Sequence, residues 1–220
     1  MKIKEKISVI IRCRNEESHI GHSIQSIINL FDHPEIIIVD NNSTDNSMKI
    51  VNLFANPTIN NCIIKKININ EYTPGLSLNE GVKKCTNNII LIISAHCKLK
   101  LIDFNKIKNS LEKYVAVWGK QIPFYFGKKV NPNRYIWQNF ENKDSINYYS
   151  YGENRYFLHN ALCFYKKDIL LKYKFDEDLI GKEDRYWAID RIKENKQILY
   201  DSSLECEHYF TSNGATWKDF

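Results

Sequence analysis

The sequence predicts an α/β protein built around a mostly parallel sheet with helices on both faces. Five short apolar runs rich in Ile and Val alternate with segments whose apolar residues recur at helical spacing. This alternation fills about the first 118 residues. It is typical of a doubly wound parallel sheet, because each parallel strand needs a long crossover connection before the next. The runs expected to form buried strands are residues 7–11, 35–39, 62–67, 89–93 and 115–118.

Helices are expected between these strands. Ile20, Ile24 and Ile27 share one helical face, so the first helix is predicted over residues 17–31. Asp45 lies in a polar turn where it can cap the second helix. Shorter apolar patterns predict further helices around residues 48–54, 78–85 and 107–111.

The pattern changes in the second half of the chain. Residues 121–158 are rich in aromatic side chains, Asn and Lys but have no clean period, which predicts an ordered insertion of loops. A further helix is expected over residues 184–195, and late strands are expected over residues 198–201 and 206–210. Because no low-complexity linker interrupts the chain, we expect one domain over residues 1–220.

The composition agrees with a folded domain and disfavours several functions. Hydrophobic residues make up 43% of the 220 residues, so disorder is not expected. The net charge of +5 comes without a basic run, so no nucleic-acid partner is expected. The six cysteines form no CxxC pair, which disfavours a zinc ribbon or a thioredoxin-like site. We expect them to be reduced and mostly buried.

No segment has the pattern of a signal peptide or of a membrane helix. The first apolar run is short and is interrupted by Arg12. No later run approaches the ~18 apolar residues that a membrane helix needs. We therefore expect a cytoplasmic protein. Peripheral association with the inner face of a membrane stays open, as does continuation of the natural chain beyond residue 220.

Polar segments follow four of the expected strands. They lie where ligands bind in open α/β sheets, beyond the carboxyl ends of the strands. These segments are residues 12–16, 40–45, 94–97 and 119–121. The sequence has no GxGxxG, no P-loop pattern and no GxSxG. Their absence argues against a dinucleotide dehydrogenase, a P-loop kinase and an α/β-hydrolase.

Several of these segments resemble glycosyltransferase family 2, whose members have the GT-A fold and generally transfer a sugar from a nucleotide donor. The matching segments are RCRNEE at 12–17, IIIVDNNSTDNS at 36–47, YTPGLSLNEG at 72–81, SAH at 94–96, GKQIP at 119–123 and GKED at 181–184. The resemblance covers nearly the whole chain. It implies a GT-A-type, Rossmann-like fold with a nucleotide-binding half at residues 1–118 and an acceptor-side half at residues 119–220. The SAHC and G-(R/K)-Q-x-P segments are also similar to those of proteins described as rhamnosyltransferases.

The resemblance implies a nucleotide site at the ends of the first strands. Asp40 would contact the nucleoside, since a carboxylate accepts hydrogen bonds from ribose hydroxyls or a base N–H. Capping of its own turn is the alternative role. Arg12 or Arg14 would hold the base or a phosphate, and a surface ion pair with Glu16 or Glu17 is an equal alternative for each. The residues expected at the nucleotide are Arg12, Arg14, Asn15, Glu16, Asp40, Asn42, Ser94 and Ala95.

The segment Ser94-Ala95-His96 departs from the family pattern. The family usually has Asp-x-Asp here, and the last Asp binds Mn²⁺ or Mg²⁺ to neutralise the diphosphate leaving group. His208 resembles the C-terminal histidine that many GT-A enzymes use as another metal ligand. In one interpretation, His96 and His208 hold a divalent metal together with donor phosphates and water. In the other, no metal binds and cationic side chains neutralise the diphosphate. Alternatively, either histidine has only a structural role and forms hydrogen bonds within its loop.

Glu183 and Asp184 resemble the acidic motif that supplies the general base in this family. The base removes the proton of the acceptor hydroxyl as that oxygen attacks the anomeric carbon, so a single displacement inverts the configuration. We expect Asp184 to be the base and Glu183 its helper. Stabilisation of a helix N-terminus is a second role that is compatible with the first.

The acceptor side is expected to use residues from the later segments. Lys120, Gln121, Asn160 and Trp187 are predicted to contact the sugar or the acceptor, although solvated-loop and structural roles stay open. Trp137, Tyr148, Tyr149 and Tyr151 offer rings that could stack on a sugar, with ordinary packing as the alternative. Gly75 is predicted to adopt a backbone conformation that other residues resist, and Asn79 to bridge loops.

The resemblance therefore implies an inverting glycosyltransferase. It would use a nucleotide-sugar donor and a glycan or lipid-linked glycan acceptor in bacterial surface polysaccharide synthesis, such as capsule or lipopolysaccharide. One alternative is a nucleotidyltransferase, although its glycine-rich loop after the first strand is absent here. The other is a non-catalytic carbohydrate- or nucleotide-binding domain, which the missing Asp-x-Asp favours and the retained carboxylates disfavour.

Overall fold

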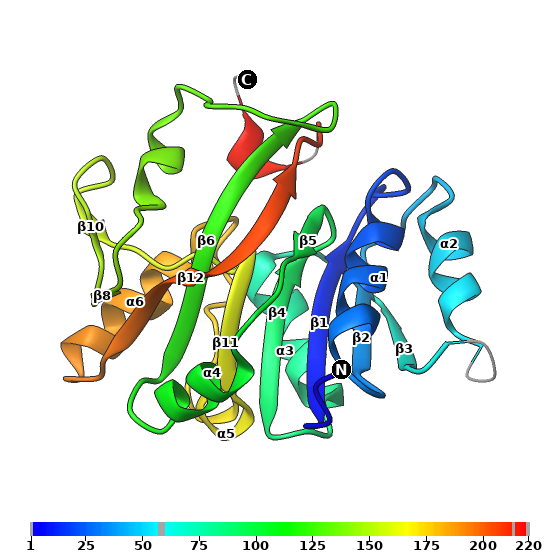
Figure 1. Cartoon of the computed structure of the whole chain (residues 1–220), viewed down its shortest axis with the longest axis horizontal. Helices are drawn as coiled ribbons and strands as arrows, with labels where there is room; N and C mark the ends of the chain where they lie inside the picture. The colour runs from blue at the N-terminus through cyan, green and yellow to red at the C-terminus, as the bar shows by residue number, and fades with distance from the viewer. Residues whose placement is uncertain (1, 57–59, 213, 219–220) are drawn as a thin grey trace.

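A mixed sheet with helices on both faces forms the body of the protein (Figure 1). The computed structural model describes residues 2–56, 60–212 and 214–218. Its main strands are β1 (Ile7–Cys13), β2 (Glu35–Asp40), β3 (Ile63–Asn68), β4 (Ile89–Ser94), β5 (Cys97–Leu99), β6 (Ala116–Tyr125), β11 (Leu162–Lys166) and β12 (Ile198–Tyr209). They lie in the order β3-β2-β1-β4-β11-β6-β12-β5. The predicted α/β class is confirmed.

Short strands complete the two sheets. The two-residue strands β7 (Lys128–Lys129) and β8 (Ser145–Ile146) pair with β6 and β12. A separate hairpin is made by β9 (Tyr149–Ser150) and β10 (Arg155–Tyr156). The expected loop insertion therefore carries several short strands, together with the 3-10 helix η1 (Tyr135–Asn139).

Every strand expected from the sequence runs in the same direction. β3, β2, β1 and β4 pair in parallel, and β6 pairs in parallel with β12. Between these two groups lies β11, which is antiparallel to both β4 and β6. The strands that reverse direction, β5 and β11 among them, are those that the sequence pattern did not reveal.

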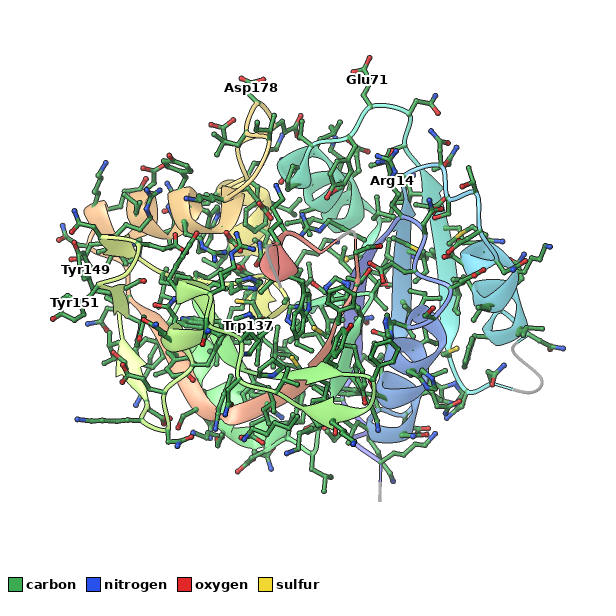
Figure 2. All side chains as sticks on the ribbon, turned by 90° about the horizontal axis from the view of Figure 1, so that it is seen from above. Arg14, Glu71, Trp137, Tyr149, Tyr151 and Asp178 are labelled. Carbon is green, nitrogen blue, oxygen red and sulfur yellow. The ribbon has the colours of Figure 1, made fainter. Side chains whose placement is uncertain are left out.

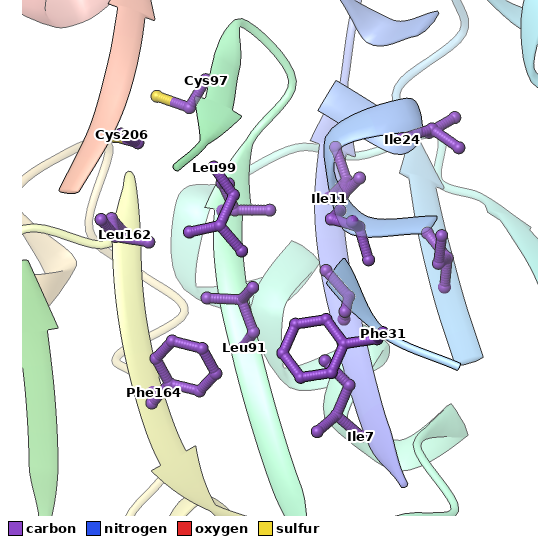
Figure 3. Packing of buried hydrophobic residues seen from close by; sticks show 14 of the residues in the cluster. Ile7, Ile11, Ile24, Phe31, Leu91, Cys97, Leu99, Leu162, Phe164 and Cys206 are labelled. Atoms are coloured by element: carbon purple, nitrogen blue, oxygen red, sulfur yellow. The ribbon is translucent and has the colours of Figure 1, made fainter. Parts of the chain in front are cut away.

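Two apolar clusters fill the space between the sheet and its helices. One cluster lies under α1 (Ile20–Leu30), α2 (Ser47–Phe54) and α4 (Phe104–Leu111). Figure 3 shows part of it, including Phe31, Leu91 of β4 and Phe164 of β11. The other cluster lies under α3 (Pro74–Lys84), α5 (Lys167–Lys172) and α6 (Glu183–Lys193). All six cysteines are free and buried, as expected.

Some predicted boundaries are wrong. The first helix begins at Ile20 rather than at residue 17. Glu17 instead forms hydrogen bonds with the loop after β2: its backbone N–H donates to Asp45, and the Glu17 carboxylate accepts from Asn46. The last two expected strands form one continuous strand, β12. Its register shifts between Asp201 and Glu205, where the buried Asp201 carboxylate accepts from Lys106 and from nearby backbone.

Gly75 is needed for a close approach rather than for an unusual backbone conformation. A Cβ at this position would lie 2.0 Å from the carbonyl oxygen of Asp176. Asn79 bridges the same two segments, as predicted. Its Nδ2 donates to the carbonyl of Phe175 and to Glu177 Oε1, at 2.9 and 2.8 Å. Together these residues fix the loop that leads into α6.

Candidate active site

The carboxyl ends of β1, β2 and β4 meet at one edge of the sheet. Arg12 lies opposite Ser94 in the β1–β4 register, and Cys13 lies opposite Asp40 in the β1–β2 register. Figure 2 looks down onto this edge, with Arg14 beside the end of β1 and Trp137 near the middle of the view. The predicted site segments are therefore brought to a common edge.

The carboxylate pair, Glu183 and Asp184, lies at this edge at the start of α6. Both residues are buried, with exposures of 5% and 4%. They occupy the first helical turn, where partial positive charge from unpaired backbone N–H groups stabilises carboxylates. The helix begins after Lys182, which makes no side-chain cap, so these acidic residues are the groups that complement its N-terminus.

Groups from β1, from the loop before β11 and from α6 itself hold the carboxylate pair. Arg12 Nη1 at the end of β1 donates to Glu183 Oε1 at 3.1 Å. The backbone N–H of Asn160 donates to Asp184 Oδ2 at 3.0 Å. Arg185 Nη1 lies 2.8 Å from the same Asp184 oxygen, and its guanidinium covers the ring of Phe157 at 4.2 Å. Arg12 thus pairs with a candidate catalytic residue rather than with Glu16 or Glu17.

The two carboxylates have different electrostatic surroundings. Burial raises the pKa of Glu183, and the adjacent charge of Asp184 raises it further, against the opposing effect of Arg12. Asp184 instead accepts several hydrogen bonds to its two oxygens. Glu183 therefore ionises less readily than an ordinary carboxyl group, and Asp184 is held by the larger number of hydrogen bonds.

The histidine pair consists of His96, in the turn between β4 and β5, and His208, in β12. Their ring centroids are 4.8 Å apart. His96 Nδ1 donates to Glu16 Oε1 at 3.0 Å, and His208 Nδ1 donates to Gln121 Oε1 at 2.7 Å. These partners leave both Nε2 atoms as the remaining ring nitrogens. His208 Nε2 is buried and has no hydrogen-bond partner within the described part of the chain.

This arrangement is the one that metal-binding histidines usually have, with one ring nitrogen oriented by an oxygen acceptor. Burial lowers the pKa of His208 well below its usual range, and His96 and His159 lower it further. A neutral imidazole is the form that binds metals. Among residues 2–56, 60–212 and 214–218, however, no three His, Cys, Asp or Glu side chains form a metal-holding group. The pair thus fits a metal only if other ligands come from the donor or from water.

The nucleotide-side residues use many of their hydrogen bonds within the loops. Asp40 accepts from the backbone N–H and the hydroxyl of Ser43, so it does cap its own turn. Asn15 Oδ1 accepts from Thr44 N at 2.8 Å and ties the loop after β1 to the loop after β2. Arg14 and Asn42 are exposed at this rim. These contacts are compatible with a nucleotide role and do not test it.

Ser94 and Ala95 lie beneath the rim. The backbone N–H of Ser94 donates to Ala161 O, and Ala95 is 1% exposed within the apolar cluster. The side chain of Ala95 therefore contributes little to the accessible edge, whereas Ser94 is half-buried.

Of the residues predicted for the sugar or acceptor, the structure brings Asn160 and Gln121 to the site but not Lys120 or Trp187. Asn160 is 1% exposed, and its Nδ2 has no partner among the described residues. The side chain of Lys120 lies on the opposite face of β6 from that of Gln121. It contacts Asn142 and Glu205. Trp187 is 3% exposed in the core, where its Nε1 donates to Tyr173 O at 2.7 Å.

The four aromatic side chains predicted as possible sugar-stacking rings lie in different parts of the molecule. Tyr148 packs against Trp118 in the core. Tyr149 and Tyr151 are exposed and lie at the left edge of the view in Figure 2, away from Arg14. Trp137 lies against His208, with ring centroids 5.2 Å apart, so it is the one of the four next to the histidine pair.

Sequence reasoning missed Arg185 and His159. Arg185 is buried between Asp184 and Glu153, and no motif distinguished it from an ordinary helix residue. His159 accepts from Ala161 N through Nδ1, and its Nε2 lies 3.3 Å from Thr216 Oγ1. Burial lowers its pKa, and the charges of Arg185 and Arg12 lower it further. A cavity of about 240 Å³ adjoins Glu16 and is lined by residues 15, 16, 18, 19 and 210–212.

A curated relative and several solved structures resemble the chain. The poly(ribitol-phosphate) beta-glucosyltransferase of Bacillus spizizenii is 29% identical over an alignment of 140 residues, with coverage of 58% of this chain and 22% of the relative. TarS 1–349 of S. aureus, solved with UDP-GlcNAc, has a TM-score of 0.71 at 18% identity, covering 98% of this chain and 62% of TarS 1–349. The mannosyltransferase PcManGT of Pyrobaculum calidifontis, solved with GDP-Man and Mn²⁺, has a TM-score of 0.63 at 15% identity, covering 96% and 59%.

The chain spans about a fifth of the curated relative and about three fifths of each solved chain. At these low identities the solved structures show the GT-A fold alone. None of the helices that the structure describes is long and apolar enough to cross a membrane. The family model of glycosyl transferase family 2 matches residues 8–174, well over half of the 220 residues, so the chain belongs to glycosyltransferase family 2.

Proposed function

We propose that the chain transfers a sugar from a nucleotide-sugar donor to a hydroxyl of a glycan or lipid-linked glycan, with inversion at the anomeric carbon. One observation carries this proposal: Arg12, from the end of β1, pairs with Glu183 at 3.1 Å beside Asp184. A buried carboxylate pair is thereby held at the edge where open α/β sheets bind their ligands. In this proposal, residues 1–118 bind the nucleotide and residues 119–220 bind the acceptor.

Asp184 is the proposed general base. Its carboxylate accepts the proton of the acceptor hydroxyl while that oxygen attacks the anomeric carbon from the face opposite the diphosphate. Arg185 and the Asn160 N–H orient the carboxylate. The bound oxygens must become partly available when the acceptor arrives, since hydrogen bonds in unliganded sites often rearrange on binding. The unpartnered Asn160 Nδ2 is a suitable donor to a sugar hydroxyl.

The histidine pair faces the leaving group in this proposal. If a divalent metal binds, His96 and His208 would hold it through Nε2, and the metal would supply positive charge that stabilises the diphosphate leaving group. Glu16 and Gln121 orient the two imidazoles through their Nδ1–H groups. Imidazole ligands suit Mn²⁺ better than Mg²⁺, which prefers oxygen. Mn²⁺ in the similar PcManGT structure supports the metal interpretation.

The nucleotide would lie over the ends of β1 and β2. Asp40, Asn42, Arg14 and Asn15 line the proposed rim, and UDP-GlcNAc bound to TarS 1–349 supports a donor of the nucleotide-sugar class. The name of the Bacillus spizizenii relative supports an acceptor among bacterial surface glycopolymers. Such synthesis would place the protein in the cytoplasm, at the inner face of the membrane.

A donor screen tests this function. UDP-, dTDP-, GDP- and CMP-sugars are added with and without Mn²⁺, and the unfolding temperature and the slow hydrolysis of each donor are measured. We expect one nucleotide class to raise the unfolding temperature and to be hydrolysed. A non-catalytic binding domain would show the first effect without the second, and the absence of both would contradict the proposal.

A further inference from the structure

The hairpin between β6 and β7 ends in an exposed aromatic side chain. Tyr125 pairs with Lys128, which leaves Phe126 and Gly127 as a two-residue turn. Phe126 is 87% exposed, and its one described ring contact is with the neighbouring Tyr125 at 4.5 Å. An apolar ring of this size gains nothing from this position within the folded chain itself.

The backbone of the turn makes this choice of residue more informative. Phe126 has φ +44° and Gly127 has φ +73°. Two-residue hairpins with positive φ at both positions strongly prefer Asn-Gly, because bulky side chains rarely adopt this conformation. The fold alone would therefore favour Asn at position 126, and the exposed Phe is disfavoured both by its solvent contact and by its backbone.

Positive charge surrounds the aromatic tip. Lys128 and Lys129 are both exposed, and neither makes an ion pair within the described part of the chain. An exposed aromatic side chain next to free lysines suits the boundary of a bilayer, where the ring enters the headgroup region and the ammonium groups meet anionic lipids. The net charge of +5 adds a favourable long-range contribution.

The hairpin is rooted in the candidate active site. β6 carries Gln121, the hydrogen-bond partner of His208, and runs on to the tip (Figure 1). Phe126 lies five positions after Gln121 along the extended hairpin, and five steps along a strand correspond to about 16 Å. A tip resting on a bilayer would thus hold the site about that far from the headgroups, within reach of a sugar carried on a lipid phosphate.

We propose that the Phe126-Gly127-Lys128-Lys129 tip docks the protein on an anionic lipid surface. The tip inserts its aromatic ring, and the two lysines bind phosphate groups of the lipids. Only the link to a lipid-linked acceptor rests on the proposed function, because binding of the tip to lipid is a property of the hairpin alone.

Vesicle sedimentation tests the proposal. The full chain is mixed with vesicles of phosphatidylcholine alone or with vesicles that also contain the anionic lipid phosphatidylglycerol. We expect binding to the anionic vesicles only, reduced by high salt. Phe126→Asn, which suits the positive φ, should weaken it about tenfold or more. Lys128→Gln with Lys129→Gln should weaken it by about fivefold per lysine.

Matched controls remove equal charge or equal exposed apolar surface elsewhere. Lys193→Gln with Lys196→Gln acts on exposed lysines at the end of α6, and Leu101→Asn acts on an 85% exposed side chain. Both controls should bind like the unaltered chain. The proposal is overturned if the unaltered chain does not bind, if the hairpin variants bind equally well, or if the controls lose as much. Donor hydrolysis in solution should be the same in all variants, so its loss would instead bear on the proposed function.

Discussion

The carboxylate pair and the histidine pair lie at the same edge of the sheet but are held in different ways. Asp184 receives hydrogen bonds on both oxygens from Arg185 and Asn160, so its partners occupy the atoms that would react. In the histidine pair the partners occupy only Nδ1, which leaves His208 Nε2 without a partner among the described residues. The carboxylates thus need rearrangement before they act, whereas the imidazoles are already oriented for a ligand.

This difference has a physical origin in the two kinds of group. A buried carboxylate is costly unless charged or hydrogen-bonded partners surround it. Burying a neutral imidazole costs less free energy than burying a charged carboxylate. One hydrogen-bond acceptor is enough to fix its tautomer. The predictions below test this contrast.

The largest expected effect is on catalysis at the carboxylate pair. Asp184→Asn keeps the shape of the side chain but removes its capacity to accept a proton, so sugar transfer should fall about 10²–10⁴-fold. Nucleotide-induced stabilisation should survive, because the proposed nucleotide rim is made by other residues. Nucleotide release and thermal shift measure the two quantities. Transfer near the level of the unaltered chain would assign the base to another residue, with Glu183→Gln as the matched comparison.

The second effect is on metal binding at the histidine pair. His208→Ala should abolish any rise of the unfolding temperature caused by Mn²⁺, and Gln121→Ala should weaken Mn²⁺ binding about 10–100-fold, since it removes only the orienting acceptor. His22→Ala, on the exposed face of α1, is the control. If Mn²⁺ has no effect on the unaltered chain, the metal-free interpretation gains support and the metal interpretation fails.

A third effect concerns the loop that leads into the carboxylate pair. Gly75→Ala forces a Cβ to within 2.0 Å of Asp176 O, so the free energy of unfolding should fall by about 1–3 kcal/mol in urea denaturation. Gly181→Ala, where a Cβ meets nothing within 4 Å, should change it by less than about 0.5 kcal/mol. Equal losses at both glycines would show that the close approach is not the cause.

The smallest effect is a pH dependence of stability. Because the pKa of Glu183 is raised in the folded protein by burial and by Asp184, the folded state holds more protons than the unfolded state above the ordinary pKa of the carboxyl. Its contribution to stability is then fully present at low pH and is lost as the pH rises toward neutrality. The stability difference between the unaltered chain and Glu183→Gln should shift in favour of the variant over that range. A difference independent of pH would contradict the electrostatic account.

The sequence predicted the first half of the fold better than the second. β1, β2 and β4 are buried on both faces, so their apolar runs are unmistakable. β11 is only 5 residues long and lies in an aromatic-rich stretch, where no alternation marks it as a strand. In β12 the polar residues Asp201, Ser202 and Ser203 suggested a break, but the buried network around Asp201 carries the strand through an irregularity.

The candidate site shows the same limits. Residues at strand ends, such as Arg12 and His96, could be placed because parallel topology brings strand ends together. The roles of Glu16 and Gln121 as partners of the two histidines could not, since each depends on a contact between segments far apart in the chain. Trp187 followed a helical pattern that fits a core residue equally well, and the structure places it there.

The most direct test is a structure of the chain crystallised with Mn²⁺ and the nucleotide sugar that stabilises it most. We predict that the diphosphate lies beside His96 and His208, that the nucleoside contacts the rim near Asp40, and that the anomeric carbon lies between the diphosphate and the carboxylate of Asp184. A nucleotide bound at another surface, with the carboxylate pair remote from the sugar, would contradict the account.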